Sequence, residues 1–260
     1  MYKKFLSFFL CLCLIGLFTS ACGGGGKTTP SDNSAFYYLL AQQNANNNEE
    51  ANNNEEANNN EEANNNEEEA VENPFSDAQV GDTVEFGRYQ QTAEGGDQTP
   101  IKWKVLAKDD DNKQVLVISL YGLDVKRFDD DSNDWKNSEI SAWLNDDFYY
   151  NSFDETEKGI IKPFEIDSVN YNVFLLSKEE AENTEYFADV ESRKCVATSY
   201  AVAHTDPAYL GDYCIWLLRS PNPFSDGYFY CVTESGSINY IYKVDNDIYL
   251  VVRPALWIKL

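Results

Sequence analysis

The sequence is poor in histidine: His204 is the only one among 260 residues. A cysteine–histidine or serine–histidine nucleophile would have to use this side chain, and its nearest candidate partners along the chain are Cys195 and Asp206. The chain also lacks a glycine-rich nucleophile elbow. Since His204 lies in a polar segment, an exposed histidine is the ordinary outcome. We therefore predict no catalytic residue and no cofactor.

Cysteine is scarce in the part of the chain that can fold. Of the six cysteines, only Cys195, Cys214 and Cys231 lie after residue 22. A scaffold built on several disulfides is therefore excluded, and the core must hold the fold. In an exported protein one pair can oxidise, but three pairings are possible and the sequence does not choose among them.

Positive charge is scarce as well, because 20 lysines and arginines stand against 44 acidic residues, for a net charge of -24. Residues 31–78 contain acids and no base at all. Such an acidic surface repels phosphate backbones and anionic lipid headgroups. We predict no binding of nucleic acid, and we expect any association with a membrane to come from a lipid anchor.

The longest apolar run lies at the N-terminus. Two lysines precede the apolar segment 5–18, as in a secretory signal peptide, and the run is shorter than the roughly 20 residues that span a bilayer. The next residues, Thr19-Ser20-Ala21-Cys22, resemble the lipobox of bacterial lipoproteins, although Thr19 stands where leucine is usual. The resemblance implies a signal peptide over residues 1–21 and a lipid on Cys22. Ordinary signal-peptidase cleavage is the alternative, and it also exports the protein.

Residues 22–78 have the composition of a spacer. Four glycines follow Cys22, and from residue 45 the unit Ala-Asn-Asn-Asn-Glu-Glu recurs through Glu68. The repeats offer no apolar face and no lysine to relieve the repulsion between glutamates, so solvated disorder is favoured over a helix. We predict a lipid-anchored, disordered acidic tether that holds the rest of the chain roughly 40 Å from the membrane.

Residues 79–260 carry the patterns of one folded domain. Alternating apolar residues predict strands over 83–89, 101–108 and 114–119, the last two joined as a hairpin. Four further strands are expected in the last third of the chain, over residues 214–218, 228–232, 237–242 and 249–258.

Helix signals lie between these two sets of strands. Apolar residues at helical spacing predict a helix over 138–150. Capping boxes at Asp154 and Ser177 predict two further short helices, the second running to about Phe187 after a strand over 173–176. The expected fold class is α+β, with twisted, mostly antiparallel sheets and two or three short helices.

Several ordered motifs resemble a bacterial family of domains of unknown function. They are the Gly-Asp-Thr-Val-Glu-Phe-Gly-Arg-Tyr motif at 81–89, Trp-Leu-Leu-Arg-Ser-Pro at 216–221 and Val-Arg-Pro-Ala-Leu-Trp at 252–257. The closing pattern is also distantly similar to the formylglycine-generating-enzyme and C-type-lectin-like folds. That likeness implies a twisted sheet with variable loops that bind partners, and it implies no activity.

Residues 129–134 form an acidic loop, Asp-Asp-Asp-Ser-Asn-Asp, that could offer oxygen ligands to calcium. It lacks the glycine and the bidentate glutamate of an EF-hand loop, since Asp134 and Ile140 hold those positions. The sequence also lacks the Glu-Pro-Asn and Trp-Asn-Asp triplets of calcium-dependent lectins. We therefore interpret the loop as a solvated acidic segment and predict no metal site.

Aromatic residues are abundant in short alternating segments, where they cannot all point inward. Flat aromatic faces beside amide and carboxylate groups suit contacts with sugars or peptides, and packing between loops is the alternative. The candidate binding residues are Trp135, Trp216, Arg219, Asp226, Tyr228 and Tyr240. For Arg219, an ion pair with a carboxylate in the fold is the alternative role.

These features favour a lipoprotein of the cell envelope, outside the cytoplasm on the outer membrane or cell surface. It would display a non-catalytic module that binds a glycan, peptide or protein. Two alternatives stay open: an enzyme of the formylglycine-generating-enzyme superfamily with an unrecognised site, and a structural protein associated with the cell wall.

Overall fold

The computed structural model describes residues 73–206, 211–244 and 249–260. The expected signal peptide, the lipid-bearing Cys22 and the glutamate-rich repeats all lie outside these residues. Within the described ranges, no helix combines the length and apolar character that crossing a bilayer requires.

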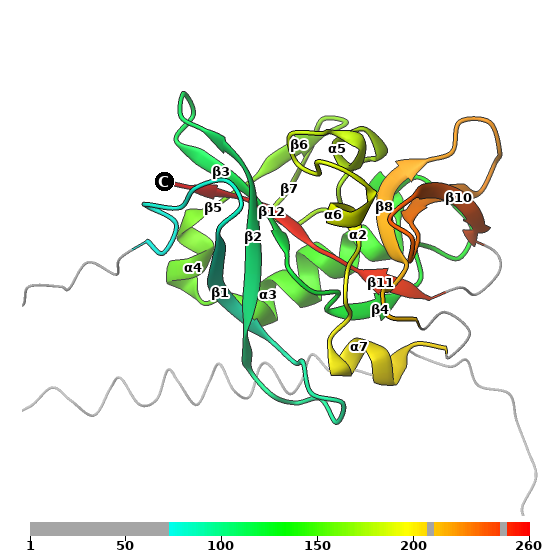
Figure 1. Cartoon of the computed structure of the whole chain (residues 1–260), viewed down its shortest axis with the longest axis horizontal. Coiled ribbons are helices and arrows are strands. Elements are labelled where there is room, and N and C mark those ends of the chain that lie inside the picture. Colours follow the sequence, from blue (N-terminus) through cyan, green and yellow to red (C-terminus); the bar gives the residue numbers. More distant parts are fainter. Residues whose placement is uncertain (1–72, 207–210, 245–248) are drawn as a thin grey trace, which may run out of the picture. The chain divides into compact units, whose positions relative to one another are not determined.

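Two five-stranded sheets, mostly antiparallel, organise the fold (Figure 1). The first sheet has the order β1-β2-β3-β12-β5. Its strands are β1 (Thr83–Tyr89), β2 (Thr99–Asp109), β3 (Gln114–Ser119), β12 (Ala255–Lys259) and β5 (Ile161–Lys162). The second sheet has the order β10-β9-β8-β11-β4. Its strands are β10 (Ile238–Lys243), β9 (Tyr228–Val232), β8 (Trp216–Pro221), β11 (Leu250–Val252) and β4 (Asp124–Lys126). A separate ribbon pairs β6 (Phe164–Ile166) with β7 (Val169–Tyr171).

The helices are short and surround these sheets. A continuous helical stretch consists of α2 (Glu139–Trp143), a π-helical turn (Leu144–Phe148) and α3 (Tyr149–Ser152), and a single 3-10 turn (Trp135–Asn137) precedes it. The others are α4 (Glu155–Ile160), α5 (Lys178–Glu182), α6 (Val190–Arg193) and α7 (Ser199–His204). The two capping boxes are confirmed, because Asp154 pairs reciprocally with Glu157 and Ser177 with Glu180.

The expected class of mixed, mostly antiparallel structure is confirmed, but the described residues contain six short α-helices where two or three were expected, and other details differ. The segment 249–258 is two strands, because Arg253 and Pro254 interrupt it where the chain leaves the second sheet for the first. Residues 173–176 are buried as expected, but their only bridge within the described chain joins Phe174 to Ala255. The helix that begins after Ser177 ends at Glu182 and not near Phe187.

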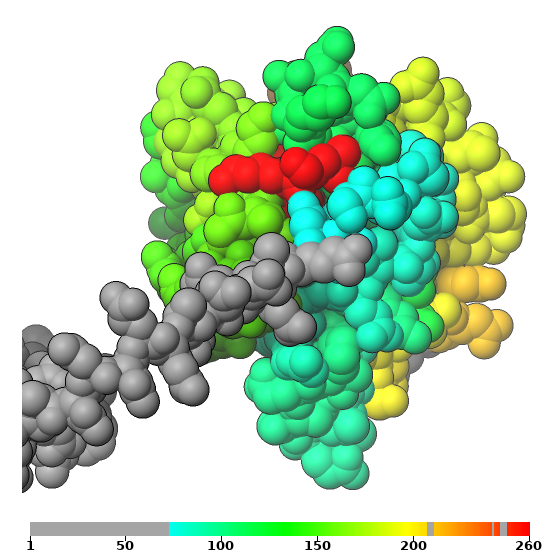
Figure 2. Space-filling model, turned by 90° about the vertical axis from the view of Figure 1, so that its left-hand side faces the viewer, coloured from blue at the N-terminus to red at the C-terminus, as the bar shows by residue number. Residues whose placement is uncertain are grey.

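The packed fold begins before residue 79, within the segment expected to belong to the tether. Phe75 is completely buried, Ala78 is 6% exposed, and the Phe75 ring packs edge-to-face on Phe86 at 5.3 Å between centroids. Asn73 Nδ2 donates a hydrogen bond of 2.7 Å to the carbonyl of Lys259. Figure 2 looks onto this face, where the first described residues (cyan) lie beside the C-terminal strand (red).

Candidate functional site

A pocket of about 350 Å³ opens where β1, β4, the helical stretch 139–152 and α7 meet. Its lining residues are Tyr89, Gln90, Gln98, Asp124, Lys126, Trp143, Asp147, Phe148, Asn151 and Tyr200. They come from segments up to about a hundred positions apart, so the site exists only in the folded chain. Its volume lies at the small end of the roughly 300–1,000 Å³ typical of ligand sites.

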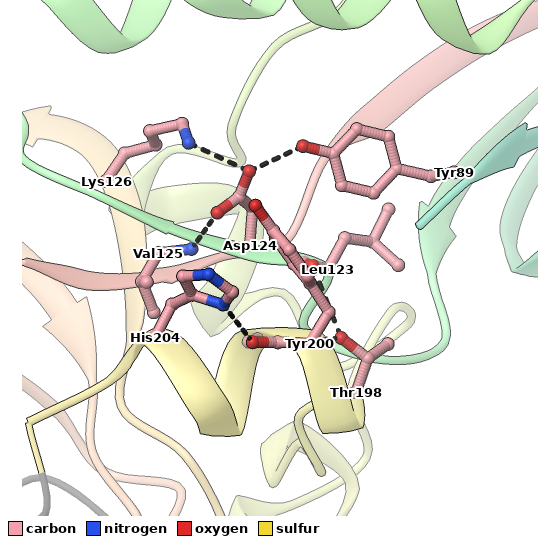
Figure 3. A network of polar contacts seen from close by, with 9 residues as sticks. Tyr89, Leu123, Asp124, Val125, Lys126, Thr198, Tyr200 and His204 are labelled. Carbon is pink, nitrogen blue, oxygen red and sulfur yellow. Dashed lines mark hydrogen bonds and ion pairs between the residues drawn. The ribbon is translucent and has the colours of Figure 1, made fainter. Parts of the chain in front are cut away.

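Asp124 lines the pocket, lies at the centre of a network of polar contacts (Figure 3) and is only 2% exposed. One carboxylate oxygen accepts hydrogen bonds from the Tyr89 hydroxyl at 2.5 Å and from Lys126 Nζ at 2.8 Å. The other accepts from the backbone N–H of Val125 at 2.7 Å. The buried charge is therefore paired and fully hydrogen-bonded, as a buried carboxylate must be.

Aromatic rings form one wall of the pocket. Tyr89 packs against Phe148 at 5.2 Å, and edge-to-face against Trp143 at 6.5 Å and Tyr200 at 6.3 Å. The ammonium of Lys126 lies 4.6 Å from the centre of the Trp143 ring, so Lys126 contacts both the Asp124 carboxylate and the indole. Trp143 is half-exposed. An aromatic surface thus reaches solvent beside fixed hydrogen-bonding groups.

Amides and a carboxylate supply the polar rim. Gln98, Asp147 and Asn151 are exposed at the mouth of the pocket. Gln90 also lines the pocket, and its side-chain oxygen accepts a hydrogen bond of 3.1 Å from the backbone N–H of Gly96. Because Lys126 neutralises Asp124, the exposed charge at the rim is that of Asp147, which favours neutral or cationic ligands.

Backbone contacts hold α7, and with it Tyr200, against the rest of the pocket. The N–H of Thr198 donates to the carbonyl of Gly122 at 2.8 Å, and its hydroxyl donates to the carbonyl of Leu123 at 3.3 Å. The N–H of Tyr200 donates to the carbonyl of Gln91 at 3.1 Å. Figure 3 shows Tyr200 and Tyr89 approaching Asp124 from different elements.

The pocket predicts a dependence of stability on alkaline pH. Burial, reinforced by the charge of Asp124, raises the pKa of Tyr89 well above its usual value. An unfolded tyrosine ionises near pH 10, so the contribution of Tyr89 is complete below about pH 10 and is lost as the pH rises further. The difference in unfolding free energy between the native chain and Tyr89→Phe should therefore shrink above that pH. Urea titrations at several pH values measure it, and a difference that stays constant would contradict the assignment.

Residues 112–260 match the family described as a domain of unknown function, DUF6273. The match covers more than half of the chain. The chain belongs to the DUF6273 family. No curated protein and no solved structure matches it significantly. Within the pocket, Asp124, Lys126, Trp143 and Tyr200 fall inside the DUF6273 match, whereas Tyr89 precedes it.

The structure removes two expected binding residues from the surface of the DUF6273 domain. Trp216 is completely buried in β8, and its indole N–H donates to the carbonyl of Arg193 at 3.1 Å. Trp135 is 4% exposed and packs on Tyr171 at 5.6 Å between ring centroids. Both expectations of a surface role were wrong for the same reason: a neighbouring element covers each indole.

Arg219 takes the alternative role, an ion pair within the fold. Its guanidinium donates to both carboxylate oxygens of Glu180, at 2.5 and 3.1 Å, and to the carbonyl of Leu175 at 2.6 Å. It also lies over the Phe174 ring. These contacts tie α5 to β8 and leave little of the guanidinium for a ligand.

The three remaining candidates lie on or near the surface, outside the Asp124 pocket. Asp226 is exposed in the turn between β8 and β9, and Tyr228 is half-buried at the start of β9. Tyr240 is 46% exposed and packs edge-to-face on Tyr230. None of the three lines the pocket.

The nucleophile candidates do not form a catalytic pair. Cys195 is 2% exposed, whereas His204 is exposed and its Nδ1 hydrogen-bonds to the carbonyl of Tyr200 in its own helix. At the acidic loop, oxygens of Asp129 and Asp130 and of Glu139 in α2 lie within 4.8 Å of one another. The Arg127 guanidinium donates to both oxygens of Glu139, so a side chain already supplies positive charge there.

Sequence reasoning missed Asp124, Lys126 and Tyr200 as site residues. The available signal was local: Asp124 stands between Leu123 and Val125, and a carboxylate flanked by apolar residues of a short strand has to be paired when it is buried. The partner of such a carboxylate cannot be read from the sequence, because Tyr89 lies 35 positions away.

Proposed function

We propose that this protein is a cell-envelope lipoprotein whose DUF6273 domain is a non-catalytic binding module, and that the Asp124 pocket is its ligand site. Export and anchoring are supported by the signal-like segment 5–18 and by the lipobox-like residues around Cys22. The acidic spacer would then present the pocket away from the membrane.

The ligand class that the pocket fits best is an uncharged carbohydrate. The observation that carries this proposal is the half-exposed Trp143 ring beside Lys126 and the carboxylate of Asp124. An aromatic surface can stack on the apolar face of a sugar ring, while amides, hydroxyls and charged groups bind its hydroxyls. The exposed Asp147 disfavours strongly acidic glycans.

Glycan binding can be tested on an array of neutral and acidic oligosaccharides probed with the full chain. Binding to neutral glycans is expected, and Trp143→Ala should weaken the strongest interaction by about tenfold or more, as loss of an aromatic anchor does. A blank array, or binding that Trp143→Ala leaves unchanged, would contradict the proposal.

Trp257→Ala is the matched control, because Trp257 is also half-exposed but lies on β12 and does not line the pocket. It should keep the affinity of the native chain. Thermal unfolding of both variants shows whether each is folded at the temperature of the binding measurement. Tyr200→Phe, which removes one hydroxyl and no ring, should weaken binding by about three- to tenfold if that hydroxyl bonds the ligand.

A further inference from the structure

The three cysteines of the folded domain are buried free thiols that the ligand pocket does not use. The sequence leaves their pairing open, and the structure distinguishes one pair of cysteines from the third. The backbone N–H of Cys214 donates to the carbonyl of Cys195 at 2.8 Å, and Cys214 Sγ lies 3.2 Å from the same oxygen. Cys195 Sγ lies 3.5 Å from the carbonyl oxygen of Val196 and 3.8 Å from that of Leu120.

Cys231 has a different environment. It lies in β9 opposite Leu217, which follows Cys214 by three residues. Three residues of extended chain span about 10 Å. Disulfides join residues whose Cα atoms are roughly 4.4 to 6.8 Å apart. Burial raises the pKa of the Cys231 thiol to about 12, so it stays protonated and unreactive.

We infer that Cys195 and Cys214 form an intramolecular disulfide when the chain folds under oxidising conditions, and that Cys231 stays a free thiol. The inference rests on the proposed export for its oxidising environment, and it does not depend on the ligand. A backbone hydrogen bond holds the two residues side by side, and a disulfide requires that its two residues lie this close.

Local charge favours the reaction at Cys195. The neighbouring Cys214 side chain and the positive charge of Arg253 lower the pKa of the Cys195 thiol despite its burial. Arg253 is itself 2% exposed, and its Nη1 has no hydrogen-bond partner among the described residues. A thiolate is the nucleophile of disulfide exchange, and a neighbouring cation increases its population.

The chemistry balances with a disulfide as oxidant. The Cys195 thiolate attacks one oxidant sulfur, the oxidant disulfide breaks, and one thiolate leaves. The Cys214 thiolate then attacks the Cys195 sulfur and releases the second. The two cysteines lose two electrons in total, and the oxidant becomes two thiols that take up the two protons. Because Cys195 and Cys214 are only 2% and 4% exposed, this exchange takes place before the segment is fully packed.

The bond would act on the ligand pocket through α7. Cys195 follows α6 and Cys214 precedes β8, so the disulfide closes a loop that carries α7 and Tyr200. For a loop of about 20 residues, closing the chain should raise the melting temperature of a domain this size by roughly 6 to 12 °C.

The test refolds the full chain from urea in a buffer of reduced and oxidised glutathione, alkylates free thiols and maps the peptides by mass spectrometry. A cross-linked peptide pair containing Cys195 and Cys214, with Cys231 alkylated, is expected. Complete alkylation of Cys195 and Cys214, or a cross-link to Cys231, would overturn the inference. Because the buffer supplies the oxidant, this result is independent of export and of glycan binding.

Two variants sharpen the result. Cys231→Ser should retain the cross-link, whereas Cys214→Ser should leave Cys195 alkylated and should show no change in melting temperature on reduction. If reduction lowers the melting temperature of the native chain and of Cys214→Ser equally, the change belongs to another cysteine pair and contradicts the inference.

Discussion

Replacing Trp216 with alanine is expected to lower the free energy of unfolding by about 3 to 5 kcal/mol. The side chain is completely buried in β8, a central strand paired on both sides by β9 and β11. Its ring packs against Phe187, and the Arg253 guanidinium lies 5.0 Å from its centre. Alanine would leave a cavity and expose a buried cation to it. Urea denaturation followed by circular dichroism measures the loss.

Tyr240→Ala is the matched control for this change, because Tyr240 also belongs to the second sheet but is 46% exposed. Its effect on the unfolding free energy should be below about 1 kcal/mol. A Trp216→Ala variant that keeps native stability would show that Trp216 is not part of the core and would restore it as a candidate surface residue.

Replacing Gly87 with alanine is the second change with a large expected effect, about 3 kcal/mol or more of lost stability. Gly87 has a φ of +67° and lies at an irregularity in the pairing of β1 with β2. A Cβ there would lie 2.4 Å from the Phe153 ring and 2.8 Å from the carbonyl of Ser152.

Gly96→Ala separates backbone strain from steric conflict. Gly96 has a similar φ of +75°, but a Cβ there would meet no atom within 4 Å. Gly96→Ala should lower the free energy of unfolding by only roughly 1 to 2 kcal/mol, which is the cost of a non-glycine residue in the left-handed region. Equal losses in the two variants, measured by urea denaturation, would show that contact with Phe153 contributes nothing.

Local signals in the sequence predicted local structure well. The capping boxes at Asp154 and Ser177 were confirmed because their partners lie three residues away and the hydrogen bonds form within one helical turn. Strand β9 was predicted with its observed bounds. The helix after Ser177 was predicted too long, because its apolar residue Phe187 is buried by a turn and not by a continued helix.

The site could not be predicted in the same way, because its residues meet only through the order of strands. The sequence offered Trp216 as a binding residue since it does not show that Phe187 and Arg253 pack on its ring. Asp124 was not expected at all, since its partner Tyr89 is brought to it by the approach of β1 to β4. The pocket is lined by several aromatic rings, but aromatic abundance in the sequence does not indicate which rings reach solvent.

The central claim is that ligand binds beside Trp143, and the indole N–H signals in a 1H–15N NMR spectrum test it most directly. The chain contains five tryptophans, and Trp143→Phe identifies one signal by its disappearance. Titration with the neutral glycan that binds best on the array should shift the Trp143 signal and leave those of the buried Trp103 and Trp216 unchanged. An unchanged Trp143 signal with shifts elsewhere would place the ligand outside the Asp124 pocket and contradict the account.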